Sequence, residues 1–211
     1  HFISDPLTLE LGETNEGAAV VGFANDLVDI SAGAFNADID ETGDDDTINA
    51  YVAAASFSLP NITFGAAYIS TLAEAGLEDD IADNVGTLQD HVPGYSLFAS
   101  VSLMDKFFIE GEYVAALEVF APGELSFDGG RPFEPKAWNI ELAYALTDRL
   151  EAALRYESSE DGGNWIPEKQ YGAVVSYDII DHTTLAVEYL RGEFENNDKR
   201  DAAVAQLAVK F

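Results

Sequence analysis

Hydrophobic and polar residues alternate with a period of two along much of the chain, most regularly over its last eleven residues. In the segment 201–211, Ala203, Ala205, Leu207, Val209 and Phe211 fall on one face of an extended chain. The other face is mixed and carries Val204, Gln206, Ala208 and Lys210. Strict alternation over this length predicts a β-strand with one apolar face.

The same alternation recurs in segments that together predict about twelve strands, an even number of the kind found in bacterial outer-membrane barrels. A strand over Leu7–Glu13 is the least regular of them. The predicted strands are Leu7–Glu13, Gly17–Ala24, Leu27–Asn36, Asn49–Ser58, Ile62–Thr71, Tyr95–Leu103, Phe107–Val119, Ala137–Thr147, Leu150–Glu157, Tyr171–Ile179, Thr183–Phe194 and Asp201–Phe211.

Short and long connections alternate between these strands from residue 25 onward. The short links lie at 25–26, 59–61, 104–106, 147–149 and 180–182, and the long ones at 37–48, 72–94, 120–136, 158–170 and 195–200. Short periplasmic turns and long extracellular loops are typical of outer-membrane barrels. A soluble sandwich has no reason to keep this alternation, and the parity places Phe211 on the periplasmic side.

Aromatic residues on the apolar face form two groups, as expected for side chains at the two membrane interfaces. The alternative is that aromatics are simply common in strands. The group near the long links is Tyr51, Tyr68, Tyr95, Trp138, Tyr156 and Tyr171, and the group near the short links is Phe23, Phe57, Phe64, Phe107, Tyr177 and Phe211. The predicted fold is all-β: an antiparallel up-and-down transmembrane β-barrel, with residues 1–211 as one domain in the outer membrane of a bacterium.

Charged residues fall on the opposite face of the predicted strands. The chain carries 39 acidic and 10 basic residues, a net charge of −29, which argues against nucleic acid as a partner. Unpaired carboxylates inside a barrel require a wet lumen, and their excess would favour cations. The alternative is that bases pair with these acids and the side chains only fill the interior. The predicted pore-lining residues are Glu110, Glu112, Glu118, Asn139, Glu141, Glu151, Arg155, Glu157, Asp178 and Glu188.

One long link is acidic enough to suggest a cation ligand set. Asp38, Asp40, Asp44 and Asp46 lie close together around Gly43, and Ca²⁺ takes six to eight oxygen ligands. The spacing lacks the closing glutamate of an EF-hand loop, so a solvated acidic loop is the alternative. No other cofactor is expected.

Three further features narrow the function. The chain has no Cys, hence no disulfide, thiolate metal site or cysteine nucleophile. It has no run of 18 apolar residues. No signal-peptide pattern opens the sequence at His1, so we expect either a mature form or further residues upstream. His1, His91 and His182 are its only histidines, and none lies in a pattern typical of a catalytic site, so an enzyme is not expected.

The opening residues His1-Phe-Ile-Ser-Asp-Pro-Leu-Thr-Leu-Glu-Leu-Gly-Glu-Thr14, followed by an alternating strand, resemble a motif of the LbtU-type siderophore porins. These are outer-membrane barrels of Gram-negative bacteria. The resemblance implies uptake of a siderophore or metal chelate, and a chain that is the C-terminal portion of a longer barrel with further strands. Arg131, Lys136, Lys169, Lys199 and Arg200 are the bases near the outer mouth that could meet an anionic chelate.

The leading expectation is therefore a passive outer-membrane porin for small solutes, with membrane lipid as its surroundings and a homo-oligomer as a candidate assembly. The alternative is a structural barrel with acidic Ca²⁺-binding loops and no significant flux. That alternative gains weight if the link Leu72–Pro93 folds inward and blocks the lumen.

Overall fold

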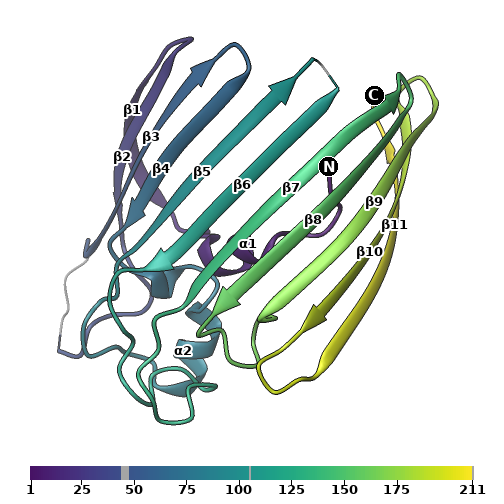
Figure 1. Ribbon diagram of the computed structural model, residues 1–211. Coiled ribbons are helices and arrows are strands. Elements are labelled where there is room, and N and C mark those ends of the chain that lie inside the picture. Colours follow the sequence, from purple (N-terminus) through teal and green to yellow (C-terminus); the bar gives the residue numbers. More distant parts are fainter. Residues whose placement is uncertain (44–47, 105, 211) are drawn as a thin grey trace.

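Eleven antiparallel strands form one continuous sheet in which every strand pairs with its neighbours in sequence (Figure 1). The computed structural model describes residues 1–43, 48–104 and 106–210. The strands are β1 (Ala18–Ala24), β2 (Val28–Phe35), β3 (Ala50–Leu59), β4 (Ile62–Ile69), β5 (Gly94–Leu103), β6 (Phe107–Ala116), β7 (Lys136–Thr147), β8 (Leu150–Glu160), β9 (Lys169–Ile180), β10 (Thr183–Glu193) and β11 (Lys199–Val209).

The up-and-down order is confirmed, but closure into a barrel is not. The sheet runs from β1 to β11 without these two strands pairing with each other in the described part of the chain. It is curved, with β1 and β11 at its two edges (Figure 1). The predicted strand ending at Phe211 is present as β11, although Phe211 itself lies outside the described residues.

The prediction of a first strand over Leu7–Glu13 was wrong, because this segment forms the helix α1 (Leu7–Gly12). Its leucines alternate, as in a strand, but Leu7 and Leu11 are also four residues apart and therefore share one face of a helix. Both are fully buried, whereas Leu9 points elsewhere and is 37% exposed. Pro6 stands immediately before the helix, where its missing N–H costs no hydrogen bond.

The outer face of the sheet is apolar over most of its height. Large side chains such as Leu142, Leu154 and Val187 lie exposed on it. Among the described strand residues, acidic and basic side chains on this face stand only near the long-loop ends, at Lys136, Glu160, Lys169, Arg191, Glu193, Lys199 and Asp201. An apolar band bordered by charges is what a strand wall facing lipid requires, because a mid-bilayer charge there costs about 2–4 kcal/mol.

Aromatic side chains mark both borders of this band. Near the long-loop end, cross-strand pairs join Tyr68 to Tyr95 and Tyr156 to Tyr171, and the Trp138 ring lies 5.5 Å from that of Tyr156. Near the short turns the pairs are Phe57–Phe64 and Phe107–Tyr144, with ring centroids 5.5 and 4.5 Å apart. The described members of the two predicted aromatic groups thus lie at opposite ends of the strands.

The long connections carry the remaining helices, η1 (Leu72–Glu74) and α2 (Glu78–Asn84), both between β4 and β5. They gather at one end of the sheet, opposite the short turns, while α1 lies on the concave side (Figure 1). The main hydrophobic core lies between α1 and the long connections. Its large members are Leu7, Leu11, Leu72, Leu77, Ile81, Leu88, Phe120, Leu125, Phe133 and Ile166. Among the described residues, no helix has the length and apolar character to cross a membrane.

Candidate functional site

The concave face of β6–β10 carries most of the polar residues predicted to line a pore. Alternation places Glu110 and Glu112 of β6, Asn139 and Glu141 of β7, and Glu157 of β8 on this face. Glu188 of β10 lies on the same face, opposite Val174 of β9. These side chains form the candidate site.

Residues 1–12 lie across this face and are held there by its carboxylates. Glu188 accepts hydrogen bonds from the backbone N–H groups of Ile3 and Ser4, and Glu157 accepts one from Leu7 at 2.9 Å. The Leu7 N–H belongs to the first turn of α1, whose donors have no partner within the helix, and Glu157 satisfies it. The carboxylates therefore anchor a segment more than 100 residues away in sequence.

Thr8 extends this attachment toward β6 and β7. Its hydroxyl donates to Glu112 Oε2 at 2.6 Å and accepts from Asn139 Nδ2 at 2.7 Å. A hydroxyl can donate and accept at once, so a single side chain bridges the two strands. Thr8 is almost fully buried.

Arg155 provides the positive charge in the middle of the anchored region. Its Nε lies 3.4 Å from Glu157 Oε2, and its Nη2 donates to the Ser4 carbonyl at 2.9 Å. The guanidinium stacks over the Phe2 ring at 4.2 Å. Gln170 donates to the same Glu157 oxygen at 2.7 Å. Because Arg155 and Glu157 are both buried, each depends on the other for charge compensation.

Apolar contacts support the attachment at both ends of the segment. Phe2 and Ile3 pack on small inward residues of β7–β10, namely Ala143, Ala153, Val174 and Ala186. Leu7 and Leu11 join Val114 and Ala137 in the main core. Gly76 lies so close to α1 that an added Cβ would stand 1.7 Å from the Glu10 carbonyl oxygen. The link 72–93 therefore packs directly on α1, as expected for a connection that folds inward.

The concave face of β1–β5 is different, since it is lined mainly by small neutral residues. Ser31, Ala54, Ala67 and Ser96 follow one another across β2–β5. A cavity of about 210 Å³ lies between these strands and α1, and Leu9 and Gly12 contribute to its wall. This is where α1 leaves the inner face uncovered.

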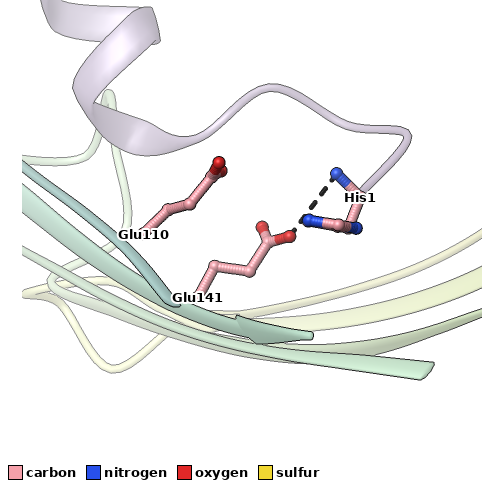
Figure 2. A group of neighbouring side chains, drawn as sticks. All are labelled: His1, Glu110 and Glu141. Carbon is pink, nitrogen blue, oxygen red and sulfur yellow. Dashed lines mark ion pairs between the residues drawn. The ribbon is translucent and has the colours of Figure 1, made fainter. Parts of the chain in front are cut away.

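Glu110, Glu141 and His1 form a separate cluster at the edge of the anchored segment, with both carboxylates pointing toward the histidine (Figure 2). Their ligand atoms lie within 4.8 Å of one another. His1 Nδ1 also lies 2.6 Å from Glu151 Oε1. A cavity of about 530 Å³ adjoins the cluster, between residues 1–6 and the strand wall.

Two predicted pore-lining residues lie apart from this arrangement. Glu118 is exposed in the long connection after β6 rather than on a strand. Asp178 lies near the short-turn end of β9, where it accepts a hydrogen bond from the Thr184 hydroxyl at 2.6 Å. Asp178 and the remaining predicted residues share the concave face.

Two of the four aspartates predicted to form a Ca²⁺ loop, Asp38 and Asp40, lie among the described residues. Asp44 and Asp46 lie outside the described residues. Asp38 is grouped with Glu16 and Glu78, their carboxylate oxygens lying within 4.8 Å of one another. Asp40 instead accepts a hydrogen bond from Asn49 Nδ2 at 2.7 Å. Because two of the four aspartates lie outside the described residues, the Ca²⁺ loop stays a prediction.

Glu74 is a buried residue that holds the acidic link in place at the long-loop end of the sheet. It is buried, and its carboxylate accepts the backbone N–H groups of Asp38 and Ile39, each at 2.8 Å. Burial raises the pKa of Glu74, and these two hydrogen bonds oppose the rise. Burial also raises the pKa of Glu78, with further increases from Glu16 and Asp38.

Three of the bases expected at the outer mouth are paired. Lys136 lies 3.2 Å from Glu134, and Lys169 lies 2.9 Å from Glu168. Arg200 donates to Gln170 at 3.0 Å. These bases are therefore engaged locally, which weakens their availability to an anionic solute.

No protein-family model and no curated protein matches the chain, so membership of the LbtU-type family stays a prediction. Solved structures of outer-membrane porins do match. A mutant of the Rh. blastica porin is 15% identical with a TM-score of 0.60, covering 91% of this chain and 54% of its own. The outer membrane channel DcaP of Acinetobacter baumannii is 14% identical with a TM-score of 0.62, covering 98% and 65%. Salmonella typhi OmpF is 14% identical with a TM-score of 0.62, covering 91% and 61%.

These matches show that the sheet has the fold of bacterial outer-membrane porins, which supports the predicted location in the bacterial outer membrane. The chain spans roughly half to two thirds of the length of those porins. General bacterial porins are among the structures it is similar to, and the siderophore porin family is not confirmed.

Several residues of the site are missing from the predicted pore lining, namely Phe2, Ser4, Thr8 and Gln170. Alternation could not select Phe2, Ser4 or Thr8, because residues 1–6 belong to no strand and Thr8 lies in a helix. Gln170 was missed because the predicted strand began at Tyr171, whereas β9 begins at Lys169. The one available signal was Arg155, which is a lone base among acids on the inner face of β8 and therefore needs partners.

Proposed function

We propose that this protein is an outer-membrane porin whose passage for small solutes favours cations. The observation that carries the proposal is the combination, on a porin fold, of an apolar outer face with an inner face rich in carboxylates. Carboxylates lining a passage concentrate cations and repel anions. Glu110 and Glu112 of β6 and Glu151 of β8 are the residues proposed to set this selectivity. Glu141 and Arg155, also predicted to line the pore, are buried.

The proposed passage follows the concave face of β1–β5, beside α1. Small side chains such as Ser31, Ala67 and Ser96 leave space there, and the cavity beside Leu9 and Gly12 lies on this route. The other half of the face is occupied by residues 1–12. Solutes would thus move between a small-residue wall and the carboxylates exposed beside α1.

The first test is single-channel conductance of the purified full-length protein in a planar bilayer, with a salt gradient across it. Open steps and a reversal potential of the sign for cations are expected. Replacing both Glu110 and Glu112 by lysine should shift that potential toward anions. Conductance without this shift would contradict the assignment of the selectivity residues.

The route itself can be tested with cysteines, because the chain has none of its own. Ser96→Cys places a thiol on the proposed route, and its neighbour Leu97→Cys places one on the outer face. A bulky methanethiosulfonate reagent should reduce conductance through S96C and leave L97C unchanged. Equal effects on both variants would refute the route.

A second candidate is a barrel with no significant flux. Residues 1–12 and the connection that carries Gly76 cover much of the inner face of β6–β10, which favours this candidate. It predicts no conductance from protein shown to be folded and inserted. Appearance of open steps once the segment is released, for example by Glu157→Ala, would identify residues 1–12 as the block.

Several finer features also belong to the proposal. They are uptake of a siderophore or other metal chelate, residues 1–211 as one domain, assembly into a homo-oligomer, and weak Ca²⁺ binding by the acidic link. Ferric chelates tested as blockers of the conductance would address the first. The local pairing of Lys136, Lys169 and Arg200 argues for a neutral or cationic chelate.

A further inference from the structure

We infer that Glu110, Glu141 and His1 form a binding site for one divalent transition-metal ion on the inner face of the sheet. This inference goes beyond the proposed function, since it requires only that residues 1–12 lie on that face. It does not require the protein to conduct.

The Glu110 and Glu141 carboxylates are close enough to repel each other, and a bound cation would offset this repulsion. Glu110 and Glu141 are direct cross-strand partners of β6 and β7, and like charges in directly opposite positions destabilise a sheet. Arg155 is the cross-strand partner of Glu141 on its other side, but its guanidinium binds Glu157 and the Ser4 carbonyl instead. The carboxylate pair is thus left without a guanidinium between its members.

Glu141 supplies independent support. The residue is only 7% exposed, yet its Oε1 has no hydrogen-bond partner among the described residues. The backbone nitrogen of His1 lies 3.5 Å from this oxygen, without hydrogen-bond geometry. A buried carboxylate oxygen without a hydrogen-bond donor is costly, and a bound cation would remove that cost. Figure 2 shows this carboxylate pointing at His1, with the Glu110 carboxylate beside it.

His1 is held in a way that suits a metal ligand. Its Nδ1 lies 2.6 Å from Glu151 Oε1, and a carboxylate on one ring nitrogen orients the imidazole so that the other can coordinate. Its ring also lies 5.4 Å from that of Phe108. Nε2 is then the nitrogen available to an ion.

The distances need only small side-chain movements. Ligands that bind one zinc ion at about 2.0–2.2 Å can be at most about 4.4 Å apart, whereas the cluster has its ligand atoms within 4.8 Å. One imidazole with two carboxylates suits Zn²⁺, Mn²⁺ or Fe²⁺ better than Ca²⁺, which prefers oxygen ligands. Glu110 and His1 are exposed, so the ion can exchange through the adjoining cavity.

The test is isothermal titration of the folded full-length protein with Zn²⁺, followed by Co²⁺ titration with visible absorption. One ion per chain is expected, and Glu141→Gln and Glu110→Gln should each raise the dissociation constant at least tenfold. Asp29→Asn is the matched control, because it removes one inward carboxylate of β2 outside the cluster and should leave the affinity unchanged.

His1→Ala is the second variant, because it leaves the strands untouched even if the glutamate variants fail to fold. It should weaken Zn²⁺ binding and remove the nitrogen-ligand contribution to the Co²⁺ spectrum. Absence of Zn²⁺ binding by the wild-type protein would overturn the inference. So would affinities for E141Q or H1A that equal that of the D29N control.

Discussion

The two halves of the concave face differ in both composition and cover. On β1–β5 the inward residues are mostly small and neutral, and α1 leaves them partly uncovered. On β6–β10 they include Glu112, Glu157 and Glu188, which hydrogen-bond residues 1–8. Carboxylates on this wall therefore act first as acceptors for a docked segment. A count of inward charges alone overstates how many of them face water.

Removal of Glu157 should have the largest effect on the docking of residues 1–12 against β6–β10. Glu157→Ala removes the acceptor of the Leu7 N–H and leaves Arg155 buried without its partner, which costs about 3–5 kcal/mol. Residues 1–12 should detach and become sensitive to protease, measured by limited proteolysis and mass spectrometry. Asp29→Ala, on the other half of the face, should leave the segment protected. Continued protection in E157A would show that apolar contacts alone hold the segment.

The apolar side of the attachment is tested by Leu11→Ala. Leu11 is fully buried, so truncation should destabilise the docked state by about 2–5 kcal/mol. Leu9→Ala is the matched control on the exposed side of the same helix and should change it by less than about 0.5 kcal/mol. Hydrogen exchange of the α1 amides measures both. Similar exchange in the two variants would contradict the packing of α1.

A smaller effect is expected on the pH dependence of stability, from Glu74 at the long-loop end of the sheet. Burial raises the pKa of Glu74 above its ordinary value of 4.5, so the folded state binds the proton more tightly than the unfolded state. Its contribution to stability is fully present below about pH 4.5 and is lost as the pH rises through the folded pKa. Glu74→Gln should flatten this dependence.

Fluorescence of Trp165, which packs against this core, measures the effect in a Trp138→Phe background during denaturant titration at several pH values. Glu118→Gln, in an exposed position, is the control and should keep the wild-type profile. A profile for E74Q as steep as that of the wild type would assign the pH dependence to other carboxylates, with Glu78 the next to test.

Alternation along the chain correctly predicted the strands from β1 to β11, the alternation of turns and long connections, and which side chains face outward. These features are local, because the period of two fixes the face of every residue once a segment is extended. The pattern failed at Leu7–Glu13, where leucines at positions 7, 9 and 11 suit a strand while positions 7 and 11 suit a helix.

The sequence by itself determined an apolar outer face and an acidic inner face. Only the tertiary structure decided that residues 1–12 occupy the inner face, that Glu112, Glu157 and Glu188 hold them, and that Glu110 and Glu141 meet His1. Each of these contacts joins residues at least 100 positions apart, which no local periodicity encodes. The helix forms there because strands distant in sequence supply acceptors for its backbone and apolar partners for Leu7 and Leu11.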